Sequence, residues 1–92
     1  MPAALLFRSR YAYRDGFIEI VIWRVPRPVT PSDHPYKYRL AYVVNGRRVV
    51  GYDNERGKGD HRHRGTREEH YRFVSPDQLI ADFMDDVKGC IK

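Results

Sequence analysis

The 92-residue sequence has a single cysteine and no long apolar run. Cys90 has no partner for an intramolecular disulfide, and one thiol near the end of the chain argues against a structural zinc–thiolate site. No apolar stretch approaches the roughly 20 residues that span a bilayer. The first residues become charged too early for a signal peptide. The sequence therefore predicts a cytoplasmic protein without a membrane segment.

Internal repeats, low-complexity segments and the nucleotide-binding pattern Gly-x4-Gly-Lys-Ser/Thr are also absent from the sequence. Hydrophobic residues make up 41% of the chain, and seven tyrosines, four phenylalanines and one tryptophan are among them, which is enough apolar surface for folding. A chain of this length fits one domain over residues 1–92. Its core is small, so a partner chain or a homodimer would add stability.

The net charge of +5 is unevenly spread. The last eighteen residues hold four aspartates against two lysines, which leaves residues 1–74 with fifteen basic and eight acidic side chains, a charge of +7. Such a field attracts polyanions and speeds their encounter with the protein at low salt. Nucleic acid is therefore the first partner predicted.

The first half of the chain predicts two β-hairpins. The expected strands, rich in aromatic and β-branched residues or alternating in polarity, are residues 5–13, 17–25, 36–44 and 47–53. Asn45-Gly46 favours a type I′ turn in the second hairpin, and Gly16 is expected to supply the positive φ in the first. Since both faces of residues 17–25 are largely apolar, this strand is predicted to be central and covered on both faces.

The remaining segments predict loops and one helix. Four prolines between positions 26 and 35 make residues 27–35 a loop, three glycines make residues 54–69 mainly loop, and residues 70–74 can form a short fifth strand. Ser75 is placed to cap a C-terminal helix. This helix is expected to direct its aspartates outward. Its apolar stripe is Leu79, Phe83, Val87 and Ile91, beside Ile80 and Met84. The predicted fold is α+β, an antiparallel sheet of four to five strands, built from two hairpins and packed by a C-terminal helix.

The segment from Tyr52 to His63, YDNERGKGDHRH, has the composition of a site. His61 and His63 are two residues apart, so in an extended chain their rings project to the same side. Two such imidazoles can act as base and acid in phosphodiester transfer. RNA supplies its own 2′-hydroxyl as nucleophile, so this chemistry needs no metal. Neighbouring cations would stabilise the phosphorane.

Other charged residues complete the predicted site. Asp60 or Glu55 would orient a histidine or an arginine, and Asp53 is an alternative acid–base or ion-pairing group. The predicted catalytic residues are His61, His63 and Asp60. The predicted nucleic-acid-binding residues are Lys58, Arg62, Arg64, Lys37, Arg39 and Arg48. Of these, Lys37, Arg39 and Arg48, with Arg47, would line one side of the second hairpin, as a binding face or simply as its solvated side.

Three alternatives remain open from the residues alone. The charged segment is also consistent with a solvated basic loop that only touches phosphate. An HxH pair with a carboxylate suits zinc or manganese, with Asp60, His61, His63 and His70 as ligands, but neighbouring arginines raise the cost of adding a divalent ion. No metal or other cofactor is predicted. The tyrosines of residues 36–44 can stack on bases, although packing is their first assignment.

Four segments in this order resemble the TumE-like family of small prokaryotic toxin components. They are Tyr36-Lys37-Tyr38-Arg39, Tyr52-Asp53-Asn54-Glu55, the run from Gly57 to His63, and the closing helix that contains Phe83. The resemblance covers nearly the whole chain and is most specific at GKGDHRH. It implies a toxin–antitoxin module in which this chain is the toxin and a helix-turn-helix antitoxin is its partner. It assigns no catalytic roles.

The predicted function is that of a type II toxin that acts on RNA as a metal-independent endoribonuclease. A non-enzymatic module that binds nucleic acid or its antitoxin, with a part in repressing its own operon, is the alternative. A metal-dependent nuclease is the third reading, which EDTA would silence.

Overall fold

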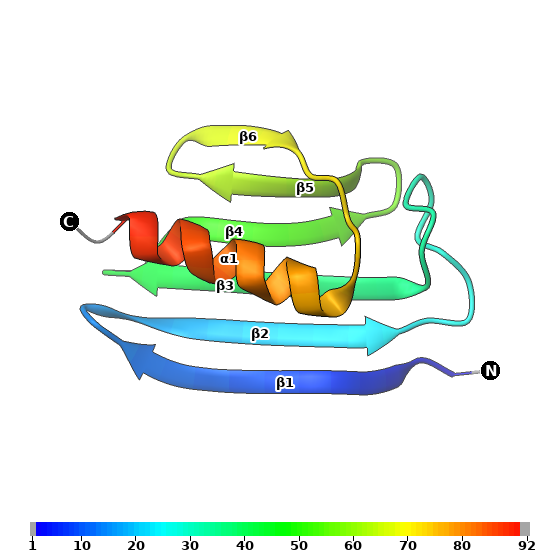
Figure 1. Ribbon diagram of the computed structural model, residues 1–92, viewed down its shortest axis with the longest axis horizontal. Helices are drawn as coiled ribbons and strands as arrows, with labels where there is room; N and C mark the ends of the chain where they lie inside the picture. The colour runs from blue at the N-terminus through cyan, green and yellow to red at the C-terminus, as the bar shows by residue number, and fades with distance from the viewer. Residues whose placement is uncertain (1, 91–92) are drawn as a thin grey trace.

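A computed structural model describes residues 2–90 as one six-stranded antiparallel sheet with a single helix lying across one face (Figure 1). The strands are neighbours in the sheet in the order in which they occur in the chain. The elements are β1 (Ala4–Tyr13), β2 (Gly16–Arg24), β3 (Tyr36–Val44), β4 (Arg47–Glu55), β5 (Gly59–Arg64), β6 (Arg67–His70) and α1 (Pro76–Cys90). Helix α1 is not long and apolar enough to cross a membrane.

The two predicted hairpins are present, and their turns differ in how they use glycine. Asn45 and Gly46 both have positive φ, as a type I′ turn requires. In the first hairpin Arg14, with φ of 55°, has the left-handed conformation that was expected of Gly16. A Cβ on Gly16 would lie 2.0 Å from the Val43 carbonyl oxygen, so this glycine is needed for the close approach of β3.

The prediction of four to five strands was too low, because residues 54–69 are mainly strand. Strand β5 pairs with β4 and β6 pairs with β5. Of the predicted fifth strand, residues 70–74, only His70 is in a strand, and residues 71–75 connect β6 to the helix. Gly57 and Gly65 lie in the turns and Gly59 begins β5, all with positive φ. These glycines therefore shape the ends of the strands and do not interrupt them.

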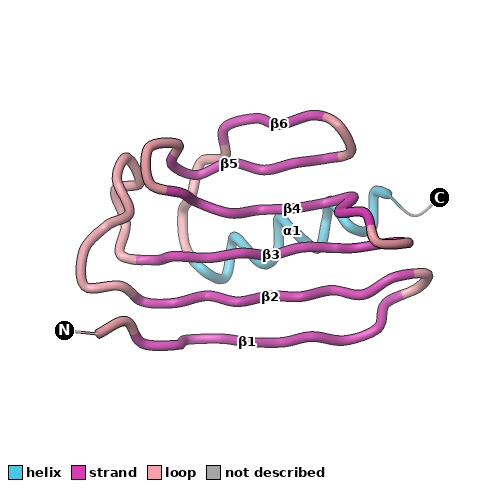
Figure 2. The backbone as a smooth tube through the Cα atoms, turned by 180° about the vertical axis from the view of Figure 1, so that it is seen from behind, coloured by secondary structure: helices cyan, strands magenta, loops and turns pink. Residues whose placement is uncertain are grey.

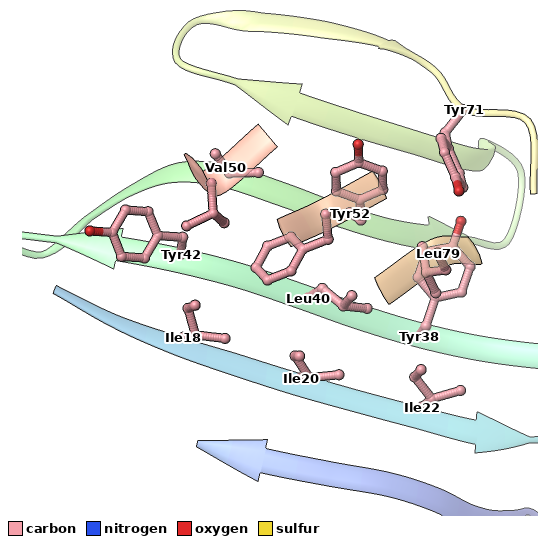
Figure 3. Close-up of a cluster of buried hydrophobic side chains, with 12 residues drawn as sticks. Ile18, Ile20, Ile22, Tyr38, Leu40, Tyr42, Val50, Tyr52, Tyr71 and Leu79 are labelled. Atoms are coloured by element: carbon pink, nitrogen blue, oxygen red, sulfur yellow. The ribbon is translucent and has the colours of Figure 1, made fainter. Parts of the chain in front are cut away.

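The core lies between the helix and the middle of the sheet. Figure 3 shows the isoleucines of β2, Leu40, Val50 and the tyrosines at 38, 42 and 52 on the face that Leu79 approaches from α1. Leu79, Phe83 and Val87 are fully buried, as the helical stripe predicted, while Ile91 lies outside the described residues. Ser75 Oγ accepts the Gln78 amide at 3.0 Å, which confirms the predicted cap.

The aspartates of α1 do not all point outward as predicted. Asp82 accepts a hydrogen bond from the Tyr71 hydroxyl at 2.6 Å, and Asp86 accepts one from the Tyr52 hydroxyl. Burial, with the hydrogen bond to Asp86 adding to it, raises the pKa of Tyr52 well above its usual value of 10.0. One edge of the helix is thus tied to the sheet by polar contacts, because buried phenols need acceptors.

The opposite face of the sheet has no covering element among residues 2–90. Seen from behind in Figure 2, the strands lie in front and the helix beyond them. Phe17, Val21 and Trp23 are on this side and are half-buried, so the prediction that β2 is covered on both faces was wrong. We call this side the open face.

Candidate active site on the open face of the sheet

Strand alternation divides the charged segment between the two faces of the sheet. His61 and His63 lie opposite Asp53 and Gly51 of β4 and belong to the open face. The alternate residues of β5 are directed to the helix side, where Arg62 lies opposite the core residue Tyr52. The two histidines are thus brought together as predicted, with ring centroids 5.1 Å apart.

Two carboxylates meet the paired imidazoles. Asp53 Oδ1 lies 2.6 Å from His61 Nε2. Glu68 Oε2, from β6, lies 3.4 Å from His61 Nε2 and 3.1 Å from His63 Nε2. The other nitrogen of His61, Nδ1, is 3.1 Å from the Gly59 carbonyl oxygen and donates to it, since a carbonyl can only accept. The proton that His61 can take or release is therefore on Nε2. We call Asp53, His61, His63 and Glu68 the histidine cluster.

The side chains of the histidine cluster differ in their exposure to solvent. The His61 side chain is only 7% exposed, whereas that of His63 is 20% exposed and that of Glu68 is 46% exposed. An incoming solute therefore meets His63 and Glu68 first. Because one Glu68 oxygen contacts both imidazoles, its position marks where another anionic oxygen would contact both rings.

Arg48 reaches this cluster because of a β-bulge. The register between β3 and β4 shifts after Tyr42, which leaves Val49 unpaired and puts Arg48 and Gly51 on the same face. The Arg48 side chain runs over Gly51, where a Cβ would lie 2.6 Å from Arg48 Cδ. Its guanidinium is 3.9 Å from Asp53 Oδ2. Because Gly51 has no side chain, Arg48 can cross it and bring its guanidinium toward His63.

Burial, followed by the Arg48 guanidinium, lowers the pKa of His63 below its usual 6.5. The ring is thus neutral at neutral pH, as a general base must be.

Replacing Gly51 with alanine should raise the pKa of His63 toward 6.5. The added methyl displaces the flexible Arg48 side chain, so the positive charge that disfavours protonation moves away. The measurement is an NMR titration of the imidazole signals. Gly89→Ala is the matched control, because nothing lies within 4 Å of its added methyl. An unchanged or lowered pKa in Gly51→Ala would contradict this account of Arg48.

Arg62 and Arg64, predicted to accompany the histidines, lie on the other side of the sheet. Arg62 Nε is 3.1 Å from Glu69 Oε1, and Arg64 donates to the same oxygen at 2.5 Å. Both arginines also approach Asp86 of the helix, at 3.5 and 3.7 Å. Their charges are already balanced by carboxylates, and the sheet separates them from His63.

Asp60 is likewise apart from the histidine cluster. Its Oδ1 accepts the His34 Nε2 proton at 2.8 Å and the Tyr38 hydroxyl at 2.7 Å, in a buried setting. The Tyr36 amide donates to His34 Nδ1 at 3.3 Å, which leaves Nε2 as the donor to Asp60. The His34 ring stacks on Phe73, with 3.8 Å between ring centroids. Asp60 therefore holds the proline-rich loop against β3, where the sequence predicted a catalytic residue.

The other predicted cations occupy different surroundings. Lys37 donates to the Asn54 carbonyl oxygen, and Arg39 Nη1 lies 2.9 Å from Glu19 Oε1. Both line a shallow hollow of about 410 Å³ on the open face, next to Asp53. The residues lining it are Val21, Trp23, Lys37, Tyr38, Arg39, Asp53 and Glu55. Lys58 is exposed in the turn between β4 and β5. Lys37, Arg39 and Arg48 thus share the face of the histidines.

The donor atoms of Asp53, His61 and His63 all lie within 4.8 Å of one another, so these three residues could hold a metal ion. Asp60, in the ligand set weighed from sequence, belongs to the His34 network, and His70 is outside this triad. The sequence indicated Asp53 as an acid–base or ion-pairing group without assigning it to His61, and it did not indicate Glu68. Strand register is the feature that would have indicated both residues as partners of the histidines, and it can be worked out only when β5 and β6 are recognised as strands.

Comparison with known proteins gives one match. The family model described as Toxin TumE matches residues 4–91, which confirms the predicted resemblance. Among the curated proteins and the solved structures no significant match is found.

Proposed function

The chain belongs to the TumE toxin family, and we propose that it acts as a metal-independent endoribonuclease whose reacting groups are His61 and His63. The observation that carries this proposal is the pairing of the two imidazoles on the open face, with Asp53 at Nε2 of His61 and Arg48 beside His63. The geometry supports different roles for the two rings.

His63 is the base, because it is the more exposed ring and its pKa is lowered. It takes the proton of the RNA 2′-hydroxyl, and the 2′ oxygen bonds to phosphorus. The bond from phosphorus to the 5′ oxygen breaks, and His61 gives a proton to that oxygen. The products are a 2′,3′-cyclic phosphate and a free 5′-hydroxyl. Asp53 contacts Nε2 of His61 at 2.6 Å and holds the ring in position; for the transfer, the leaving oxygen replaces Asp53 as the partner of that nitrogen.

The scissile phosphate takes the place of the Glu68 carboxylate between the two imidazoles. Arg48 then stabilises the charge that develops on the phosphorane, the role that the sequence assigned to Lys58, Arg62 and Arg64. Lys37 and Arg39 extend the cationic surface across β3, and Trp23 offers an aromatic ring at the edge of the hollow for a neighbouring base. The RNA strand therefore lies across the open face.

Purified protein should cleave labelled single-stranded RNA at neutral pH, equally well with and without EDTA. The expected fragments end in a cyclic phosphate, because the 2′-hydroxyl is the nucleophile. The same RNA with a 2′-deoxy nucleotide at each cleavage position should resist cleavage there. Loss of cleavage in EDTA would indicate a metal-dependent nuclease. Binding of RNA without any cleavage would favour a non-enzymatic nucleic-acid-binding module.

A helix-turn-helix antitoxin in a type II module is the proposed protein partner, and the cytoplasm, where RNA is translated, is the proposed place of action. An acidic antitoxin segment would cover the open face and compete with RNA. The affinity of the complex should then fall steeply as salt rises, which titration at several salt concentrations measures. A complex that forms equally well in high salt would contradict this mode of neutralisation. The predicted homodimer stays a prediction.

A further inference from the structure

The ligand atoms of the histidine cluster converge as those of a metal site do. His61 and His63 each direct Nε2 toward a carboxylate, and with Asp53 they place three donor atoms within 4.8 Å of one another. Two imidazoles and a carboxylate are a donor set that suits Zn²⁺. Glu68, within 3.4 Å of both Nε2 atoms, is near enough to supply a fourth oxygen.

Two further features of the cluster favour a cation. The Gly59 carbonyl holds the Nδ1 proton of His61, the arrangement that orients a ligating histidine and leaves Nε2 free to bind. Because Nδ1 of His61 donates to Gly59, Nε2 of the neutral ring has no proton to offer, and Asp53 Oδ1, buried 2.6 Å from this nitrogen, accepts no hydrogen bond within the part of the chain that the structure describes. A buried carboxylate oxygen without a donor is costly, and a bound cation would satisfy it.

The charge around the cluster also permits a divalent ion. The sequence argued against a metal because arginines flank both histidines, but Arg62 and Arg64 lie on the helix side and are paired with Glu69 and Asp86. Arg48 is the cation that approaches the cluster, at 3.9 Å from Asp53. The carboxylates of Asp53 and Glu68 offset its charge, so the repulsion expected from the sequence is largely removed.

We propose that Asp53, His61 and His63 bind one Zn²⁺ ion, with Glu68 completing the site, and that the bound ion switches off RNA cleavage. The inhibitory part rests on the proposed function. A metal ion occupies the Nε2 lone pairs of both rings, so His63 cannot take the 2′-hydroxyl proton and His61 cannot deliver one. The chain then cleaves RNA without Zn²⁺ and does not cleave it with Zn²⁺ bound.

The binding part is tested by calorimetric titration of the EDTA-treated, chelator-free full-length chain with ZnCl₂. One ion per chain is expected. His63→Gln and Asp53→Asn should each weaken binding at least about 100-fold, the upper end for loss of an outer-shell partner. Asp33→Asn and Cys90→Ser are matched controls, because they remove exposed donors that are not part of the cluster and should leave the affinity unchanged. Absence of binding, or equal affinity in the cluster variants, overturns the proposal.

A second measurement uses the unsubstituted chain and so does not depend on variants that fold. In NMR spectra ZnCl₂ should shift the imidazole signals of His61 and His63 and leave in place that of His34, which donates to Asp60. A shift confined to His34 or His70 would overturn the site.

RNA cleavage in the same samples separates the two parts of the proposal. Zn²⁺ should stop cleavage at one ion per chain, and EDTA should restore it. Zn²⁺ binding at the cluster by a chain that never cleaves RNA would remove the proposed function and leave the metal site standing. Cleavage that requires Zn²⁺ would overturn the inhibitory part.

Discussion

Replacing His63 with alanine should lower the rate of RNA cleavage by about 10²–10⁴-fold, the usual contribution of a positioned general base. The same change should release growing cells from the toxicity of the protein. The reason is that His63 is the accessible ring of the pair and is neutral at neutral pH, since burial and Arg48 lower its pKa. Initial rates on labelled RNA and growth after induction are the two measurements.

The controls for His63→Ala separate catalysis from folding. His70→Ala removes an exposed histidine of the neighbouring strand β6 and should leave both cleavage and toxicity as they are. The double variant with His61→Ala should be scarcely slower than His63→Ala alone, because residues that act as a unit are not additive. If His63→Ala cleaves RNA and poisons cells as well as the parent does, the catalytic assignment is wrong.

Replacing Asp60 with alanine should lower the free energy of unfolding by about 3 kcal/mol, because two buried donors lose their acceptor at about 1–3 kcal/mol each. The donors are His34 Nε2 and the Tyr38 hydroxyl. Burial, then the hydrogen bond to Asp60, raises the pKa of Tyr38 well above its usual value, so this hydroxyl stays protonated and needs an acceptor. Urea denaturation measures the change.

Asp33→Ala is the matched control for this prediction. Asp33 lies beside His34 in the same proline-rich loop, but it is exposed, so its loss should leave the urea midpoint almost unchanged. If the Asp60→Ala variant remains folded in dilute buffer, it should still cleave RNA, because the Asp60 carboxylate lies outside the histidine cluster. A fully stable variant that has lost cleavage would support the catalytic role that the sequence suggested for Asp60.

The charged segment shows how far local sequence can be interpreted here. Its polarity and glycines indicated a loop, because isolated strands of alternating charge have little to bury. In the folded chain several of these charges have a partner on a neighbouring strand, for example Asp53 for His61 and Glu69 for Arg62. These partners are eight and seven residues away in sequence, so neither composition nor hydrophobic periodicity could indicate the strand.

The division of the cations between the two faces was also beyond local pattern. The i, i+2 spacing correctly placed His61 and His63 on one side, since it depends only on an extended backbone. The same alternation sends Arg62 and Arg64 to the other side, a consequence that was missed because the segment was read as a loop. Asp60, counted with the histidines by proximity in sequence, is directed to His34 in the proline-rich loop.

The two hairpins, the capped C-terminal helix with its apolar stripe, and the pairing of the histidines could all be predicted from the order of the residues. These features depend on turn residues, side-chain periodicity and neighbours within a few positions, all of which are local. The folded chain was needed to establish that the helix covers one face of the sheet, that Arg48 approaches His63 over Gly51, and that Asp53 and Glu68 face the imidazoles. These features could not be predicted because strand register and the choice of buried face arise from contacts between distant segments, which together bury the core.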